Sequence, residues 1–204
     1  MSLHATLLDA WQRLGARLKL ARCDELGEQL IRRYAEPHRV FHTTAHLADV
    51  LKVLREFQAE DRLSLAAWFH DAIYVPGARD NESRSAQLAR DSLRACKLSQ
   101  ADTVFVEEAV LATASHVAQR PEFAPLLDAD LSILGAPAVQ YANYCAAIRR
   151  EYAALSDEDF GKGRRAFLQG ILKRDAIFGT PEGISRFEAN ARRNLAAELR
   201  DYDD

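Results

Sequence analysis

The sequence has few cysteines, no strong excess of charge of either sign and no long apolar run. Its three cysteines, Cys23, Cys96 and Cys145, are widely spaced and form no Cys-x-x-Cys pair. Neither a disulfide framework nor a zinc knuckle is therefore expected, and the cysteines are interpreted as small core residues in a reducing compartment. The net charge is −3, with Lys and Arg scattered among Asp and Glu. Because a nucleic-acid backbone is bound by a basic stripe, no nucleic-acid polymer is expected as a partner.

The apolar runs are too short for a membrane role. None approaches the roughly 18 apolar residues of a membrane span, and charge interrupts the N-terminal apolar residues too early for a signal peptide. The chain is therefore expected to be cytoplasmic and to have no membrane partner. Whether it forms a homodimer stays open at this point.

The pattern of apolar residues predicts helices almost throughout. The chain has 204 residues, 48% hydrophobic and 28% charged, which suffices for one well-packed domain. Helical periodicity dominates, and no convincing period-two strand appears. The predicted fold class is all-α, a helical bundle with no significant sheet. Helices are expected at about 3–18, 24–35, 44–59, 62–74, 80–97, 100–118, 123–134, 137–153, 157–175 and 181–200.

Turn and cap residues mark several of these helix ends. Pro76-Gly77 is expected to end the helix at 62–74. Helix starts are expected at three caps, namely Asp80, Ser99 with Asp102, and Thr180 before Pro181.

The pair His70-Asp71 is the main indication of chemistry. It lies between Leu63 and Val75, where Ser64 is the only other polar residue. A helix that is apolar all round is buried, and an isolated carboxylate in it costs several kcal/mol unless it is neutralised, paired or bound to a cation. A histidine next to a carboxylate supplies half of a coordination shell for a divalent transition metal.

Asp130 and His46 are the expected partners of this pair. Asp130 has a large aliphatic residue at each position three and four residues away, so it is expected to be the buried acid. Asp128 has mixed neighbours and is expected outside the metal shell, in a solvated or supporting position. His46 lies at the edge of the apolar stripe of the helix at 44–59. A buried salt bridge to an arginine explains Asp130 alone, and a satisfied core histidine explains His46 alone, whereas a shared metal explains both together with His70-Asp71.

Further candidates surround this expected shell. Glu82 follows the His-Asp helix closely and could position water or contact substrate, or else complement the helix dipole. His116 has small residues on its side of the predicted helix, which could leave room for a second metal or a phosphate, or it is a partly buried histidine. The residues that could give positive charge to an anionic substrate, or be solvated surface groups, are His42, Arg39, Lys52, Arg79 and Arg120.

Five segments in order resemble the HD-domain superfamily of metal-dependent phosphohydrolases, and more narrowly a bacterial branch of predicted HD-superfamily hydrolases. Its H…HD…D signature matches His46, His70-Asp71 and Asp130. The resemblance covers nearly the whole chain and implies a single HD-type domain over 1–204. The signature core would span about 38–135, with the N- and C-terminal helices packed on it. The segments are Phe41–His46, Trp68–Tyr74, Asp80–Ala86, Ala112–His116 and Asp128–Gly135.

In this superfamily the signature residues bind a divalent metal ion. The resemblance therefore implies that His46, His70, Asp71 and Asp130 are the metal ligands here. Two histidines and two carboxylates suit Mn²⁺, Fe²⁺, Co²⁺, Ni²⁺, Mg²⁺ or Zn²⁺ and leave positions for water and a phosphoryl oxygen. Such an ion lowers the pKa of its water from 15.7 toward about 7. The expected activity is hydrolysis of a small phosphorylated metabolite, in particular a nucleotide.

The resemblance also favours functional roles for His116 and His42. Asp71, Glu82 and His116 are the expected catalytic residues, and His42, Glu82 and His116 are expected to contact the substrate. Two alternatives remain open. One is a di-iron oxygenase of HD fold, which needs at least two more ligands, of which only His116 and His42 are candidates. The other is a catalytically silent module that binds a metal or ligand.

Two departures from known branches narrow the expected substrate. No Glu-Asp pair follows His70-Asp71 by one helical turn, because the next residues are Ala-Ile-Tyr-Val-Pro-Gly. This disfavours hydrolysis of guanosine tetraphosphate. No His-His pair follows His116, which disfavours a cyclic-dinucleotide phosphodiesterase.

Overall fold

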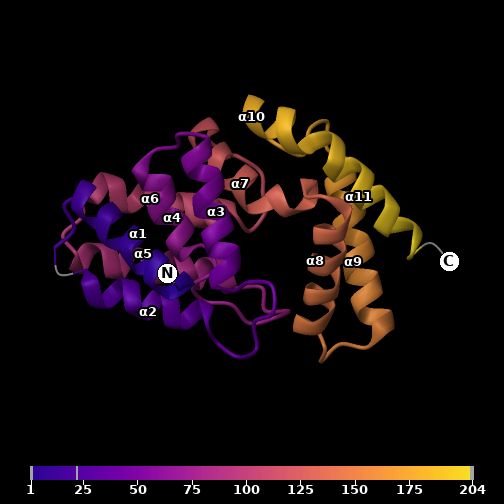
Figure 1. Ribbon diagram of the computed structural model, residues 1–204, viewed down its shortest axis with the longest axis horizontal. Coiled ribbons are helices and arrows are strands. Elements are labelled where there is room, and N and C mark those ends of the chain that lie inside the picture. Colours follow the sequence, from indigo (N-terminus) through magenta and orange to yellow (C-terminus); the bar gives the residue numbers. More distant parts are fainter. Residues whose placement is uncertain (1, 22, 203–204) are drawn as a thin grey trace.

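The computed structural model describes residues 2–21 and 23–202, and within these ranges no strand occurs. The predicted all-α fold class is confirmed (Figure 1). The longer helices are α1 (Leu3–Arg17), α2 (Asp24–Tyr34), α3 (Thr44–Glu56), α4 (Asp61–Phe69), α5 (Asn81–Ala95), α6 (Gln100–Ala112), α7 (Ala124–Leu131), α8 (Ala138–Glu151), α9 (Asp157–Leu172) and α11 (Ala189–Arg200). Shorter segments are η1 (Pro121–Phe123), η2 (Ser132–Gly135), α10 (Pro181–Gly183) and the π-helical η3 (Ile184–Glu188).

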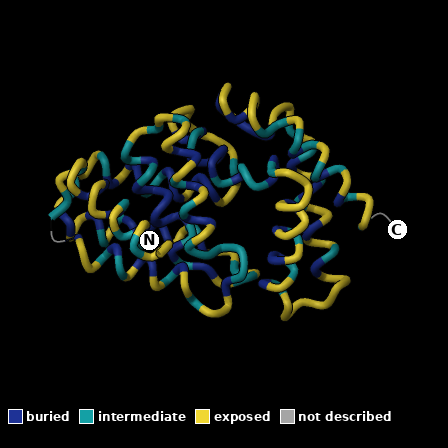
Figure 2. Tube along the Cα trace, in the orientation of Figure 1, coloured by how far each residue is buried: buried dark blue, intermediate teal, exposed yellow. Residues whose placement is uncertain are grey.

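Two hydrophobic clusters hold the helices together. The N-terminal core is built mainly from α1 to α7, and in it the rings of Trp11 and Trp68 meet edge to face at 5.1 Å. The C-terminal core is built from residues between the end of α7 and α11, with Leu168 and Leu195 fully buried. Phe187 packs against both cores. Figure 1 shows α1 to α7 on one side and α8, α9 and α11 on the other, and Figure 2 shows buried chain on both sides.

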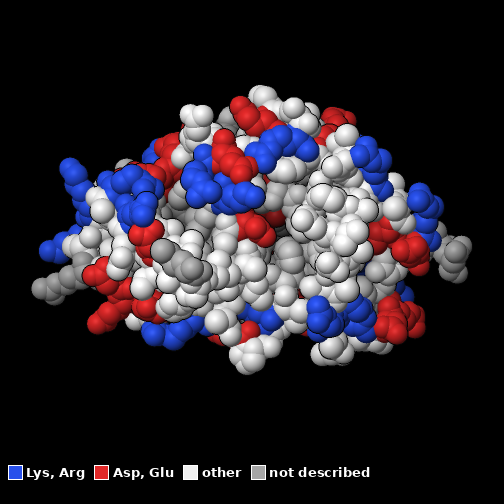
Figure 3. Space-filling view, viewed as in Figure 1, with Lys and Arg blue, Asp and Glu red and all other residues white. Residues whose placement is uncertain are grey.

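The surface in view carries both charge signs. Figure 3 shows Lys and Arg interspersed with Asp and Glu around this face, and neither sign forms a continuous stripe there. Within residues 2–21 and 23–202, no helix combines the length and the apolar composition that crossing a bilayer requires.

Two predicted helix caps are confirmed. Ser99 Oγ accepts the backbone N–H of Asp102 at 3.1 Å, and Thr180 Oγ1 accepts that of Gly183 at 2.9 Å. Asp80 stands at the start of α5, but its side chain makes no capping hydrogen bond. The helix predicted at 181–200 is divided into α10, η3 and α11.

Helix α4 ends at Phe69, so the prediction of a helix over 62–74 is wrong at its C-terminal end. His70 is the residue after the last helical one, and Pro76-Gly77 lies in the loop that follows. The buried Arg39 guanidinium explains the early end, because it donates hydrogen bonds at 2.7 Å to the Asp71 carbonyl and at 3.3 Å to the Ala72 carbonyl. Because these two carbonyl oxygens already accept hydrogen bonds from Arg39, they do not need the backbone N–H groups of a further helical turn.

Asp128 attaches α7 to the C-terminal segment. Its carboxylate accepts the N–H of Gly179 at 2.7 Å, the N–H of Thr180 at 2.8 Å and the Thr180 hydroxyl at 2.6 Å. Asp128 is only 2% exposed, so a solvated position for it is wrong, although it does lie outside the histidine cluster. The expectation that Asp130 is the buried acid of this helix is wrong as well, because Asp128 is the more deeply buried of the two and Asp130 is only partly buried. Burial raises its pKa, against the effect of these hydrogen bonds. A side chain at Gly183 would collide with this carboxylate, which explains the glycine there.

Candidate metal centre

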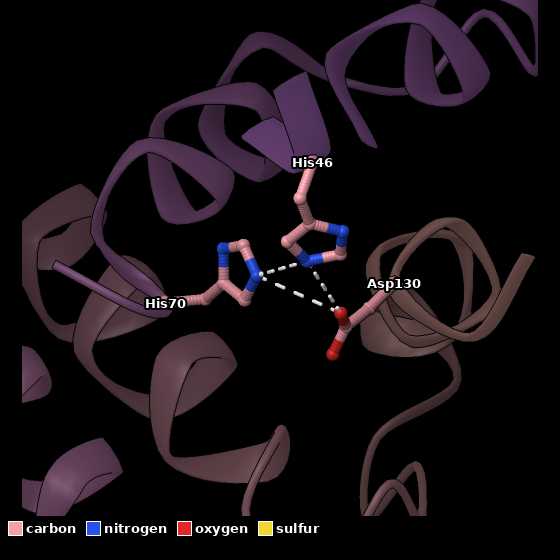
Figure 4. A group of neighbouring side chains, drawn as sticks. All are labelled: His46, His70 and Asp130. Atoms are coloured by element: carbon pink, nitrogen blue, oxygen red, sulfur yellow. Dashed lines mark hydrogen bonds and ion pairs between the residues drawn. The ribbon is translucent and has the colours of Figure 1, made fainter. Parts of the chain in front are cut away.

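Three predicted ligands converge from three elements. His46 stands in the first turn of α3, His70 directly after α4, and Asp130 near the end of α7. Their side chains point toward one another in Figure 4. His46 Nε2 lies 3.2 Å from His70 Nε2 and 3.2 Å from Asp130 Oδ1, and His70 Nε2 lies 3.6 Å from the same oxygen. A group of this composition and spacing could hold a metal ion.

Asp71 stands beside this group. Its Oδ2 lies 3.2 Å from His70 Nε2 and 3.8 Å from His46 Nε2. The structure therefore brings all four predicted ligands together, with both carboxylates close to the same imidazole nitrogen. The ion-pair partners of Asp130 are the imidazoles of His46, His70 and His116, whereas the salt-bridge interpretation required an arginine.

The ring of His70 is oriented for ligation. Its Nδ1 lies 2.8 Å from the carbonyl oxygen of Ala67, which can only accept a hydrogen bond. The proton of the neutral ring is therefore on Nδ1, and the lone pair of Nε2 faces the cluster. The hydroxyl oxygen of Tyr34 lies 3.4 Å from Nδ1 of His70.

The carboxylates of Asp71 and Asp130 make the centre of the cluster a favourable place for a positive charge. Burial opposes ionisation of Asp71 and Asp130, but the neighbouring imidazoles outweigh it and hold the pKa of both carboxyls below its usual range. Burial also lowers the pKa of His70, but Tyr34 and the two carboxylates outweigh this and raise the pKa well above its ordinary value. The carboxylates thus stabilise a positive charge at this point. A metal ion bound here would supply that charge and take the place of the proton.

His116 reaches the cluster from a turn. Helix α6 ends at Ala112, so the expectation that His116 lies on a helix face is wrong. The residue has a left-handed backbone, with φ at 49°, and Arg174 donates a hydrogen bond at 2.7 Å to its carbonyl oxygen. Its Nε2 donates to Asp130 Oδ2 at 2.9 Å. The two oxygens of Asp130 therefore face different histidines, and His116 lies beside the cluster.

Glu151 supports the candidate site and was not expected there from the sequence. Its Oε1 accepts the backbone N–H groups of Val40, Phe41 and His42 at 2.7 to 2.9 Å, and its Oε2 accepts from His42 Nδ1 at 2.6 Å. The Tyr74 hydroxyl also donates to Oε2, at 3.0 Å. Glu151 therefore fixes the loop before α3 and the ring of His42. The signal was available, because every residue three and four positions from Glu151 is apolar.

The contact between His42 and Glu151 favours the protonated form of His42. Burial opposes ionisation of Glu151, but the hydrogen bonds from His42 and the backbone outweigh it and hold its pKa at about 2. Burial also lowers the pKa of His42, but the charges of Asp71 and Glu151 outweigh that effect and raise it. With Nδ1 committed to Glu151, a protonated His42 has Nε2–H left as a donor.

Replacing Glu151 with Gln is expected to destabilise the protein by about 2 to 3 kcal/mol near pH 6, because the amide cannot accept all five hydrogen bonds. The stability lost in Glu151→Gln depends on pH. The folded-state pKa of about 2 lies below the unfolded value of about 4.3, so this stabilisation is complete above pH 4.3 and is lost as pH falls toward 2. Urea unfolding at pH 6, 4 and 3 should show the two proteins converging in stability. A constant difference would contradict this assignment.

A cavity of about 390 Å³ opens onto the cluster. Its polar side includes His42, Asp71, Glu82, His116 and Asp130. Glu82 lies in the first turn of α5 and is partly exposed, and no hydrogen bond or ion pair joins it to another residue in the described ranges. Its carboxylate is therefore available to water or substrate in the cavity.

The other basic residues proposed for the rim do not contribute there. The Arg39 guanidinium is buried and serves backbone carbonyls, including that of His42 at 3.2 Å. Lys52 lines a second cavity, of about 530 Å³, which reaches His46. Arg120 pairs with Glu108 and Glu122. These residues and Arg79 do not line the cavity beside Asp71. His42 is the rim candidate that does.

Comparison with protein-family models, with curated proteins and with solved structures finds no match for this chain. The fold and the site alone therefore define the class. It is an all-α protein in which a histidine and aspartate cluster, able to hold a metal ion, borders a cavity.

Proposed function

We propose that this protein is a metal-dependent phosphohydrolase that acts on a small phosphorylated metabolite, a nucleotide being the first candidate. The observation that carries the proposal is the group formed by His46, His70 and Asp130 beside a cavity, with Asp71 Oδ2 3.2 Å from His70 Nε2. The resemblance of the sequence to the HD-domain superfamily supports the same assignment.

The donor set fits a divalent ion. Two imidazole nitrogens with two carboxylates suit Mn²⁺, Fe²⁺, Co²⁺, Ni²⁺, Mg²⁺ or Zn²⁺. When bound, such an ion polarises a phosphoryl oxygen and lowers the pKa of its water. The two candidate ligands His46 and His70 do not line the cavity, whereas Asp71 and Asp130 do. A phosphoryl group thus approaches from the carboxylate side.

The remaining residues have distinct tasks in this proposal. Glu82 orients the attacking water and takes its proton, because its carboxylate is unpaired and borders the cavity. His42 donates Nε2–H to a phosphoryl oxygen, since Glu151 holds its other nitrogen. His116 orients Asp130 through the 2.9 Å hydrogen bond and presents its ring to the substrate.

A di-iron oxygenase is the second candidate, and one contact favours it. Asp130 turns Oδ1 to His46 and Oδ2 to His116, as a carboxylate that bridges two ions would. Among the described residues, the side chains that could hold a metal form one group, His46, His70 and Asp130, and His116 belongs to no second group of this kind. This observation supports one metal ion better than two.

The test is a phosphate-release screen on protein whose metal content has been measured. Nucleoside mono-, di- and triphosphates and p-nitrophenyl phosphate are each offered with Mn²⁺, Co²⁺, Ni²⁺ or Mg²⁺. We expect metal-dependent phosphate release that a chelator abolishes. Two irons per chain with oxygen consumption and no phosphate release would instead identify the oxygenase. Metal binding with neither reaction would identify a silent binding module.

A further inference from the structure

We propose that the substrate is a phosphomonoester whose single phosphoryl group is attached to an apolar or aromatic body, and that α8 and α9 form the wall on which this body lies. The inference rests on the proposed function, because it assigns the phosphoryl group to the metal cluster. It adds which part of the cavity selects the substrate. It also names the position that sets the size of that part.

The cavity has two chemically different halves. The polar half belongs to the loop before α3, the segment after α4, and α5 and α7. The other half is mostly apolar, although α9 also contributes Asp159 and Arg164 to it. Its apolar residues are Leu134, Ile148, Tyr152, Phe160 and Phe167. The rings of Tyr152 and Phe160 stand 6.1 Å apart. Since apolar surface gains free energy when a ligand removes it from water, this wall favours an apolar or aromatic group.

The charges around the cavity limit the number of phosphoryl groups. Four carboxylates line it, those of Asp71, Glu82, Asp130 and Asp159, whereas Arg164 is the only Lys or Arg among the described lining residues. The Arg164 guanidinium is already committed, because it donates to both carboxylate oxygens of Glu198 at 2.7 and 3.0 Å and to the Tyr144 hydroxyl at 3.0 Å.

This balance disfavours a di- or triphosphate. The phosphoryl group at the cluster would have a bound ion and the Nε2 side of His42, whose Nδ1 is held by Glu151, as its partners. A second or third phosphoryl group would face the carboxylates without a free basic side chain to neutralise it. A phosphomonoester instead places its uncharged apolar or aromatic body in the space that a second phosphoryl group would occupy. Nucleoside monophosphates satisfy this requirement, and so do simple aryl phosphates.

Gly163 determines how large the body can be. It lies on α9 within the apolar half, and a Cβ added to it would meet no atom within 4 Å. A longer side chain at this position therefore extends into the cavity without displacing the protein around it. Gly170 is a matched control on the same helix, two turns further on. Its Cβ would also meet open space, but it does not line the cavity.

The experiment compares Gly163→Leu, Gly170→Leu and the unaltered chain. Leucine is a better helix former than glycine, so both variants are expected to fold. The substrates are 1-naphthyl phosphate and methyl phosphate, and the readout is the ratio of their kcat/KM values. The unaltered protein should prefer the naphthyl ester by about tenfold or more. Gly163→Leu should lower this ratio at least tenfold, and Gly170→Leu should leave it unchanged.

Binding of 1-naphthylphosphonate, measured by calorimetry, gives a readout that needs no turnover. Its Kd should rise at least tenfold in Gly163→Leu and stay constant in Gly170→Leu. AMP should bind more tightly than ATP. An unchanged substrate ratio and Kd in Gly163→Leu, or tighter binding of ATP, would overturn the inference and leave phosphohydrolysis standing. Absence of phosphate release from every ester would overturn the proposed function, whereas the phosphonate result would still decide whether the wall binds an apolar body.

Discussion

Asp130→Asn is expected to lose the bound metal, with at least about 100-fold weaker affinity, while Asp128→Asn keeps it. Asp130 places Oδ1 within 3.6 Å of both His46 and His70, so the substitution removes the charge that faces the ion. Asp128 lies two residues away in α7, but its carboxylate binds the backbone at Gly179 and Thr180. Metal content of the purified variants, measured by mass spectrometry and by titration with Mn²⁺ or Co²⁺, checks the prediction.

Stability should change in the opposite order for the two variants. In Asp128→Asn the new amide group faces donors, so unfolding in urea should require about 1 to 3 kcal/mol less than in the unaltered chain. The apoprotein of Asp130→Asn loses a charge from a crowded cluster and should be affected less. Equal metal content in the two variants would contradict the assignment of Asp130, rather than Asp128, as the metal ligand of α7. A stable Asp128→Asn variant would contradict the anchoring role of Asp128.

Glu82→Gln is expected to lower turnover by roughly 10² to 10⁴, the contribution of a positioned acid or base, with metal content unchanged. The carboxylate borders the cavity but belongs to no ion pair of the described residues, so its charge contributes to stability only through the small effect of the dipole of α5. Phosphate release, metal stoichiometry and melting temperature are measured on one preparation.

Glu25→Gln is the matched control, because Glu25 is exposed in the first turn of α2 and does not line the cavity. Each substitution removes one charge near a helix N-terminus, which is worth about 0.3 to 1 kcal/mol of stability. If the two variants lose the same small amount of stability and both keep full activity, Glu82 only complements the dipole of α5. Attention would then move to His116 and His42 as the groups that position water.

The residues that could be recognised from sequence are those whose burial follows from neighbours in the same helix. Apolar residues around Asp130 and beside His46 predicted that both point inward, and the structure places them 3.2 Å apart. The all-α fold and the caps at Ser99 and Thr180 follow from the same local rules.

The features that sequence reasoning missed depend on partners far along the chain. The end of α4 is decided by Arg39, 32 residues before the carbonyl of Asp71 that it binds. Asp128 is buried because of a segment 51 residues later. Glu151 lies 109 residues after the histidine that it holds. A period of 3.6 residues contains no information about such contacts.

The division of the cavity between two hydrophobic cores has a consequence for how this protein can evolve. The residues that could hold a metal are anchored in the N-terminal core, whereas α8 and α9, which supply much of the apolar wall, belong to the C-terminal core. Substitutions exposed on the wall, such as those at Gly163, therefore do not have to alter the packing around the histidines. Under the proposed function, relatives that diverge in α8 and α9 are expected to acquire new substrates while they retain the reaction at the histidine and aspartate cluster. A library confined to those two helices is therefore the natural starting point for redesign.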